Sequence, residues 1–321
     1  MTGLFLLIST AVYLAIAFTA ILTSRPKRPE AEGLGDFSLL RTVDYRGLPP
    51  VEGFAARDGT RLAYRRYPAG GGKVLILIHG SAYHGRYLHD LARFVAYRDA
   101  AEVYTPDLRG HGRSGGRRGD ADYVGQLEDD LAELIRRVRE RSPAAKIVLA
   151  GHSSGGGLAV RFGGGKHREK ADAYILLAPF LRHNAPTTRK NSAGWAMPYL
   201  GRFVGLSMLN NIGVRALNHM TVIDFNMPEE ARDGTEVLSY SYAMSESFAP
   251  RRRYWKDLWS IARPLLVLVG EADEAFRAEA YAEVLAGHPT AEVKVLPGVS
   301  HLGIVVSPEA KTAVVNWLKG L

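Results

Sequence analysis

Residues 146–162 read KIVLAGHSSGGGLAVRF. The apolar run 146–150 predicts a buried strand, GHSSG at 151–155 has the form G-x-S-x-G, and residues 156–162 are typical of a helix. Between a strand and a helix, such a turn lifts the central serine hydroxyl clear of the sheet edge, and its glycines let the backbone turn without clashes. We therefore predict that Ser153 is a nucleophile.

A second match to the same pattern, GRSGG, occupies residues 112–116. It lies in a run of glycines and arginines, with no predicted strand before it and no predicted helix after it. Because the pattern alone arises by chance in chains rich in glycine and serine, its context decides. Ser114 is therefore interpreted as a loop residue.

Strand and helix patterns alternate on both sides of Ser153. A continuous apolar run typical of a buried strand occupies residues 73–78, and further strands are predicted at 102–106, 173–178, 264–269 and 292–296. Helical patterns occupy residues 88–97, 123–141 and 308–318. An Asp-Gly turn at 58–59 joins two alternating runs, 52–57 and 61–67, and predicts a β-hairpin. The alternation predicts an α/β fold, a mostly parallel central sheet with helices on both faces.

The alternation stops between residues 180 and 263. Strand signals are weak there, and helices are expected at 198–206 and 236–248. We interpret this segment as an insertion between two core strands of one domain, residues 51–321, preceded by a Pro- and Gly-containing linker at 25–50. Its large apolar side chains either line an acyl pocket or form the core of the insertion itself: Trp195, Met197, Tyr199, Phe203, Met208, Phe225, Met227 and Tyr240.

Two residues near the C-terminus suit a serine nucleophile. A serine hydroxyl attacks well when a histidine takes its proton and a carboxylate orients that histidine. Asp273 and then His301 follow the last two predicted strands, at the sheet edge where such sites lie. We predict that they complete a catalytic triad. Glu271 and Glu274 are alternative acids, and a capping or packing role is the alternative for His301.

Attack on a carbonyl creates an oxyanion, which needs hydrogen-bond donors already in place. One expected donor is the backbone N–H of Ser154, directly after the nucleophile. The other is expected from the loop HGSA, residues 79–82, and we assign it to the backbone of Ser81. A plain strand-exit turn is the alternative interpretation of this loop.

The chain contains no cysteine, which excludes disulfides, thiolate nucleophiles and Cys-ligated metals. His84 and His89 are five residues apart, a spacing that does not suit paired metal ligands on a helix. We expect neither a cofactor nor a metal. His152, next to the nucleophile, is expected to shape the turn.

The N-terminus is strongly apolar. Residues 4–22 are nearly all apolar, and as a helix they span about 28 Å, close to the thickness of a bilayer core. We predict a single transmembrane anchor at residues 1–24. A cleaved signal is the alternative, disfavoured because no Lys or Arg precedes the apolar run. The basic cluster RPKR at 25–28 favours a cytoplasmic catalytic domain, with a secreted or periplasmic location as the alternative.

The formal charge of +8 indicates attraction to anionic surfaces. Aromatic and basic residues do not interleave as they do in RNA-binding segments, so we expect a membrane partner and no nucleic acid. The sequence leaves the oligomeric state open.

Two loops resemble those of a known family. HGSAYHGRY, residues 79–87, resembles the oxyanion loop of the monoacylglycerol lipase and lysophospholipase group (serine aminopeptidase S33 type) of α/β-hydrolases. DLRGHGRSGG, residues 107–116, resembles the D-x-R-G-H-G-x-S-x-G loop of the same group. The resemblance runs from about residue 52 to the C-terminus. It implies the α/β-hydrolase fold, with the 180–263 insertion as a cap and a structural role for the second loop.

These features predict a membrane-anchored serine hydrolase that cleaves carboxylic esters, such as monoacylglycerols or lysophospholipids, through an acyl-enzyme on Ser153. A serine aminopeptidase or amidase of the same fold is one alternative. It needs a cap carboxylate for the substrate amine, and Glu229 and Glu230 are the candidates. A non-catalytic binding protein of this fold is a second alternative, disfavoured by the complete set of serine, histidine and acid.

Overall fold

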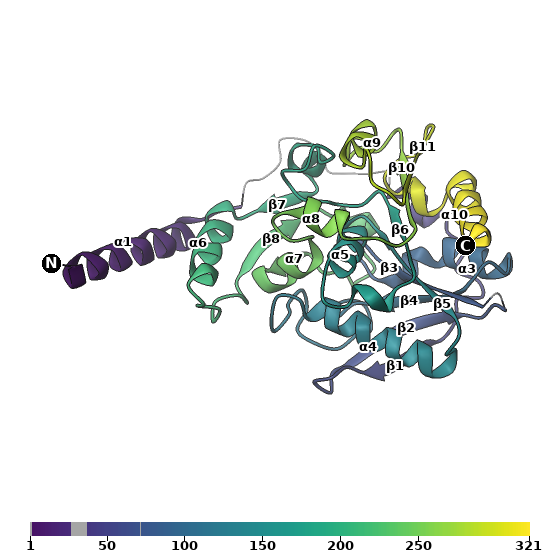
Figure 1. Ribbon diagram of the computed structural model, residues 1–321, viewed down its shortest axis with the longest axis horizontal. Coiled ribbons are helices and arrows are strands. Elements are labelled where there is room, and N and C mark those ends of the chain that lie inside the picture. The colour runs from purple at the N-terminus through teal and green to yellow at the C-terminus, as the bar shows by residue number, and fades with distance from the viewer. Residues whose placement is uncertain (1, 27–36, 71) are drawn as a thin grey trace.

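The computed structural model describes residues 2–26, 37–70 and 72–321 and is built around an eight-stranded sheet (Figure 1). Its strands are β1 (Val51–Ala55), β2 (Arg61–Tyr67), β3 (Lys73–Ile78), β4 (Glu102–Asp107), β5 (Lys146–His152), β6 (Ala173–Leu177), β10 (Leu265–Gly270) and β11 (Ala291–Leu296). They lie in the order β1-β2-β4-β3-β5-β6-β10-β11. β2 pairs antiparallel with β1 and β4, and every later pair is parallel. The predicted mostly parallel sheet is confirmed.

The centre of this sheet is buried on both faces. Every residue of β4, β6 and β10 is buried, as expected for strands that are covered on both faces. At the antiparallel edge, β1 and β2 form the predicted hairpin, in which the Ala56 N–H donates to the Thr60 carbonyl at 2.8 Å. Gly59 in this turn has φ +83°, a conformation that glycine adopts at low cost.

Helices cover both faces of the sheet (Figure 1). The longer core helices are α3 (His89–Tyr97), α4 (Gln126–Arg141), α5 (Ser154–Gly163), α9 (Glu279–Val284) and α10 (Pro308–Gly320). Single-turn helices are α2 (Ser38–Arg41), η1 (Gly85–Leu88), η2 (Arg168–Lys170), η3 (Lys190–Gly194), η4 (Glu229–Ala231) and η5 (Gly303–Val305). Helix α4 begins three residues later than predicted because Gly125, just before it, has φ +104°.

The segment between β6 and β10 holds a small antiparallel sheet and three α-helices, besides the short η3 and η4. The strands are β7 (Ala196–Pro198), β8 (Thr221–Phe225) and β9 (Ser239–Ser241), and the helices are α6 (Leu200–Asn211), α7 (Tyr242–Phe248) and α8 (Tyr254–Trp259). A helix was expected over residues 236–248, but only the second part of this range, α7, is helical. The expectation was wrong for the first part, which contains a strand. Strand β9 pairs with β8 there, and Ser241 then caps α7 by accepting a hydrogen bond from the Met244 N–H.

Helix α1 (Thr2–Thr23) projects from the body of the molecule, and its second half lies along α6 (Figure 1). Ala17 and Ile21 of α1 pack against Leu206 and Leu209 of α6 in a small apolar cluster of their own. The close approach depends on glycine, because a Cβ added to Gly205 would lie 2.4 Å from the Ala17 carbonyl oxygen. The N-terminal helix is thus attached to the insertion through α6.

Candidate active site

Ser153 occupies the sharp turn between β5 and α5, with φ 54° and ψ −121°. A non-glycine residue with positive φ is strained, and the turn is possible only because its neighbours lack side chains. A Cβ on Gly151 would lie 2.2 Å from the Gly155 backbone, and one on Gly155 would lie 2.5 Å from the His79 carbonyl oxygen. The glycines of the motif therefore hold Ser153 at the carboxyl end of the sheet.

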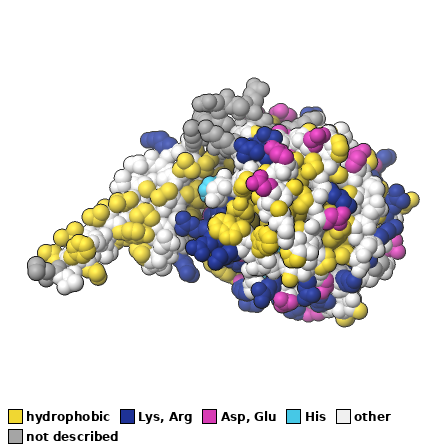
Figure 2. Space-filling model, turned by 45° about the horizontal axis from the view of Figure 1, so that its top comes forward, with side chains coloured by type: hydrophobic (Ala, Val, Ile, Leu, Met, Phe, Trp, Pro, Cys, Tyr) yellow, Lys and Arg dark blue, Asp and Glu magenta, His cyan; other side chains and the backbone are white. Residues whose placement is uncertain are grey.

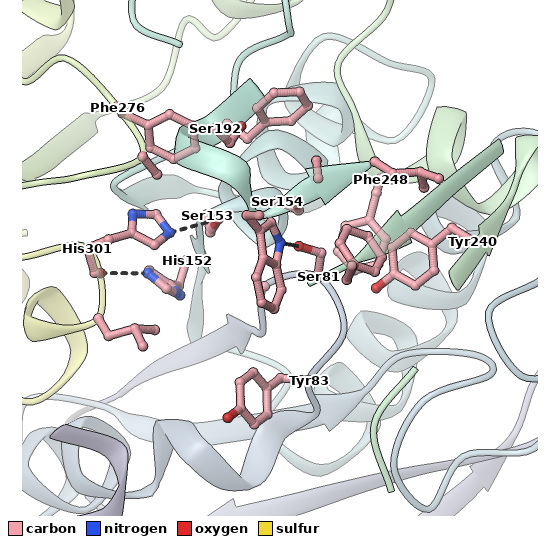
Figure 3. Close-up of a pocket in the computed structure, with 18 of the residues that line it drawn as sticks. Ser81, Tyr83, His152, Ser153, Ser154, Ser192, Tyr240, Phe248, Phe276 and His301 are labelled. Atoms are coloured by element: carbon pink, nitrogen blue, oxygen red, sulfur yellow. Dashed lines mark hydrogen bonds between the residues drawn. The ribbon is translucent and has the colours of Figure 1, made fainter. Parts of the chain in front are cut away.

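The structure brings the three predicted triad residues together. The Nε2 atom of His301 lies 3.1 Å from Oγ of Ser153 (Figure 3). Its Nδ1 atom lies 2.8 Å from Oδ2 of Asp273. The Asp273 side chain is fully buried, and its second oxygen accepts hydrogen bonds from the N–H groups of Ala275 and Phe276, each at 2.8 Å. With Nδ1 protonated toward Asp273, Nε2 is free to accept the serine proton.

The surroundings of His301 favour its protonated form. Burial opposes the charge, but the negative charge of Asp273 and its hydrogen bond outweigh burial and raise the pKa of His301 above 6.5. A stronger base at Nε2 suits removal of a proton from a serine hydroxyl.

The alternative acids lie elsewhere. Glu274 accepts a hydrogen bond from the backbone N–H of His301 at 3.0 Å, and Glu271 accepts one from the Gly298 N–H at 3.2 Å. Neither carboxylate bonds to the imidazole ring. Among the three acids of this loop, the ring of His301 therefore faces Asp273.

The two predicted oxyanion donors face the same pocket. Both Ser81 and Ser154 line it, next to Ser153. In the described part of the chain, neither backbone N–H has an acceptor, whereas the flanking N–H groups of Gly80 and Ala82 are bonded to tyrosine hydroxyls. The arrangement leaves two N–H groups available to a developing oxyanion.

Ser114, in the second match to the serine motif, makes hydrogen bonds that hold a loop in place. Ser114 is 7% exposed and donates to the Asp107 carbonyl, while its oxygen accepts the Ala63 N–H at 2.8 Å. Its hydroxyl joins the 107–116 loop to β2. No histidine or acid bonds to it among the residues described.

The pocket beside Ser153 has mainly apolar walls. Of the predicted large side chains of the insertion, Trp195, Phe225 and Tyr240 line it, and the other five do not. Phe37 also lines it, 5.7 Å from Trp195 between ring centroids. Sequence reasoning missed Phe37, because a lone aromatic residue in a linker carries no local signal. No Asp or Glu is among the described residues of the lining.

His152 and Tyr87 form a second layer behind the triad. The Tyr87 hydroxyl lies 2.8 Å from Nδ1 of His152. Nε2 of His152 lies 3.0 Å from the His301 carbonyl oxygen (Figure 3). The expectation that His152 shapes the turn fits these contacts. The role of Tyr87 was not foreseen. Within the described residues, no group of three or more His, Cys, Asp or Glu side chains is placed to hold a metal ion.

Comparison with known proteins supplies three kinds of similarity. The family model described as serine aminopeptidase, S33, matches residues 72–304. The chain is 34% identical over 132 residues to a monoacylglycerol lipase of Mycolicibacterium smegmatis, covering 39% of this chain and 45% of that protein. It is 30% identical over 147 residues to the monoglyceride lipase of Rattus norvegicus, covering 45% of this chain and 46% of that protein. The matched region thus spans under half the length of these curated relatives.

Solved structures show the same fold. A monoacylglycerol lipase from Paleococcus ferrophilus superposes with a TM-score of 0.60 at 18% identity, covering 81% of this chain and 98% of that one. A soluble variant of the Saccharomyces cerevisiae monoglyceride lipase, in complex with a substrate analogue, superposes with a TM-score of 0.66 at 17% identity, covering 87% and 96%. At such identities the likeness establishes the architecture of the α/β-hydrolase fold.

Proposed function

The chain belongs to the serine aminopeptidase S33 family, and we propose on that premise that it is a serine hydrolase that cleaves carboxylic esters of lipids, such as monoacylglycerols or lysophospholipids. The matched relatives include proteins named monoacylglycerol lipase and monoglyceride lipase. The observation that carries the proposal is the convergence of Ser153, His301 and Asp273 beside an apolar pocket.

The proposed reaction has two halves. His301 takes the proton of Ser153 as the serine oxygen attacks the ester carbonyl, and the N–H groups of Ser81 and Ser154 bind the oxyanion. The oxyanion collapses, the alcohol leaves with the proton from His301, and the acyl group stays on Ser153. Water, deprotonated by His301, then attacks the acyl-enzyme and releases the carboxylic acid. Asp273 orients His301 and stabilises its positive charge throughout.

The lining of the pocket favours esters with an acyl chain over peptides. An aminopeptidase needs a carboxylate near the nucleophile to bind the substrate amine, and the described lining contains none. Glu229 and Glu230, the candidates from sequence, are exposed and do not line the pocket. We propose that the insertion 180–263 acts as a cap within a catalytic domain at residues 51–321, and that Trp195 and Phe225 contact the acyl chain.

We further propose that α1 holds this domain at a membrane. It is 22 residues long, an 18-residue stretch of it has a mean hydropathy of 2.3, and most of its side chains are exposed. Figure 2 shows hydrophobic side chains along the projection that α1 and α6 form. Removal of α1 as a signal would expose Leu206 and Leu209 of α6, which favours retention of the helix. The flank beginning at Arg25 favours a cytoplasmic domain; residues 27–36 lie outside the described residues.

A fluorophosphonate probe and two substrates test the catalytic proposal. The probe labels the native protein and fails to label Ser153→Ala, which keeps the melting temperature of the native protein. Turnover of a monoacylglycerol exceeds turnover of an aminoacyl anilide and falls by about 10⁴-fold or more in Ser153→Ala. If the native protein does not react with the probe, the result supports the alternative of a non-catalytic binding protein. If it hydrolyses the anilide faster than the monoacylglycerol, the result supports the amidase alternative.

A further inference from the structure

Three consecutive backbone N–H groups of the loop after β3 are treated differently by their surroundings. The Gly80 N–H donates to the hydroxyl oxygen of Tyr87 at 2.8 Å, and the Ala82 N–H donates to the hydroxyl oxygen of Tyr240 at 2.8 Å. The N–H of Ser81, between them, has no acceptor within the described ranges. Two tyrosines therefore bind the neighbouring donors, and the donor between them belongs to Ser81, a residue that lines the pocket.

The hydrogen bonds of Tyr240 can be assigned completely. Nδ1 of His111 lies 2.9 Å from the Arg109 carbonyl oxygen, so Nδ1 carries the proton and Nε2 is an acceptor. The Tyr240 hydroxyl, 2.6 Å from Nε2, donates to it and accepts from the Ala82 N–H. Burial, with the charge of His79 as the next cause, holds the pKa of His111 well below 6.5, and burial raises the pKa of Tyr240. Neither group changes its role near neutral pH.

Tyr240 belongs to the insertion and not to the central sheet. It lies on β9, is 2% exposed, and its ring stacks on Phe248 with centroids 5.6 Å apart. Two further bonds join the insertion to this loop. The Val237 N–H donates to the Ala82 carbonyl at 2.9 Å, and Nε1 of Trp195 donates to Oγ of Ser81 at 3.1 Å (Figure 3).

The loop needs this support because its backbone is strained. Ala82 has φ +66°, in the left-handed region that costs a non-glycine residue free energy. Such a conformation persists only where surrounding bonds over-determine it. Tyr240 holds the N–H of the peptide that links Ser81 to Ala82. This peptide shares the Cα atom of Ser81 with the peptide that carries the Ser81 N–H, so fixing it restricts the position of Ser81.

We propose that Tyr240, oriented by His111, is a positioning residue that fixes the Ser81 N–H as an oxyanion donor, so that the cap completes the oxyanion hole. The inference rests on the proposed serine hydrolase function. It also gives the RGHG loop at 109–112 a definite purpose, because His111 supplies the acceptor that sets the Tyr240 hydroxyl.

The test is Tyr240→Phe, which keeps the ring stack and removes only the hydroxyl. We expect kcat for a monoacylglycerol to fall about 10- to 100-fold, less than the about 10²- to 10³-fold that loss of a donor itself costs. KM should change by less than about threefold. Affinity for an alkyl trifluoromethyl ketone, which forms an oxyanion on Ser153, should fall in parallel with kcat. Affinity for an alkylglycerol ether, which forms none, should stay within about threefold.

Tyr199→Phe is the matched control, because its hydroxyl bonds to Asp224 within the insertion and lies outside the pocket lining. Tyr199→Phe should leave kcat, KM and the affinities for the ketone and the ether unchanged. If Tyr240→Phe does not fold, as judged by circular dichroism, His111→Gln and His111→Leu decide. His111→Gln keeps an acceptor for the Tyr240 hydroxyl and should keep the affinity for the ketone. His111→Leu removes the acceptor and should lose affinity for the ketone but not for the ether.

Equal losses of ketone and ether affinity, or no loss of either, would overturn the inference. This result is distinct from failure of the proposed function, in which the native protein itself neither reacts with a fluorophosphonate nor hydrolyses the ester.

Discussion

The ring of His152 donates a hydrogen bond from Nε2 to the carbonyl oxygen of His301, 3.0 Å away. The same ring accepts the hydroxyl of Tyr87 at Nδ1, so it joins the nucleophile turn to the loop of the catalytic histidine. Burial, with the charge of His301 as the second cause, holds the pKa of His152 well below 6.5. His152 therefore stays neutral while His301 gains and loses its proton.

Replacing His152 by Leu removes both bonds and leaves the buried Tyr87 hydroxyl without its acceptor. We expect the free energy of unfolding to fall by about 1–3 kcal/mol and kcat to fall about 10-fold. His152→Gln retains one donor and one acceptor and should recover most of both losses. Urea denaturation and steady-state ester hydrolysis measure the two effects. A Leu variant with native kcat would show that the bond to His301 does not position the base.

The pH dependence of kcat/KM should report His301. Only its neutral form accepts the serine proton, so activity rises with pH through the pKa of His301, which lies above 6.5. In Asp273→Asn the carboxylate charge is gone and burial dominates, so the inflection should move to lower pH. The rate should also fall by about 10⁴-fold. An unchanged inflection in Asp273→Asn would assign the titration to another group.

Acid should destabilise the fold through its buried neutral histidines. Burial is the main cause that lowers the pKa of His79 to about 4 and holds the pKa of His111 and His152 well below 6.5. Each group contributes stability that is fully present above its unfolded pKa of about 6.5 and is lost as pH falls toward its folded pKa. The melting temperature should therefore decline from pH 6.5 to pH 4. A melting temperature that is flat over that window would contradict the assignment.

The glycines of the nucleophile turn should tolerate no side chain. A Cβ on Gly155 would lie 2.5 Å from two backbone carbonyl oxygens, those of Ile78 and His79, and neither can yield without moving β3. Gly155→Ala should lower the free energy of unfolding by about 3 kcal/mol or more, seen as loss of soluble protein or of urea resistance. Gly320→Ala, where the added Cβ meets nothing within 4 Å, is the control. Equal stability of the two variants would mean that the turn is looser than described.

The sequence predicted those parts of the fold whose signals are local. Strands β3 and β10 were predicted from continuous runs of Val, Ile and Leu, and the G-x-S-x-G turn from the strand and helix patterns on either side of it. Asp273 and His301 were predicted because chain order and strand ends restrict where the partners of Ser153 lie, and the structure brings the three residues together. Predicting this triad therefore required only the order of the strands in one sheet.

What the sequence could not predict depends on contacts between distant segments. Strand β9 is three residues long and gains its partners from β8, so helical propensity nearby was misleading. Phe37 lies at the pocket wall, where its ring contacts those of Trp195 and Tyr83, and no local sequence pattern marks it. Tyr240 is 158 residues from Ala82, whose N–H it accepts. Such pairs are decided by packing and not by periodicity.

The last prediction concerns the membrane. The chain has no cysteine, so a single introduced cysteine can carry a polarity-sensitive fluorophore without background labelling. Val204 is 55% exposed on α6, the helix that packs against the apolar α1, whereas Tyr97, at the end of α3, is 85% exposed on the catalytic domain. In the full chain reconstituted into vesicles, a label on Val204→Cys should show blue-shifted emission and be quenched by lipids with nitroxide-labelled acyl chains. A label on Tyr97→Cys should show neither effect. Identical water-like spectra at both positions would mean that α6 stays outside the bilayer and that α1, if it inserts, separates from the cap.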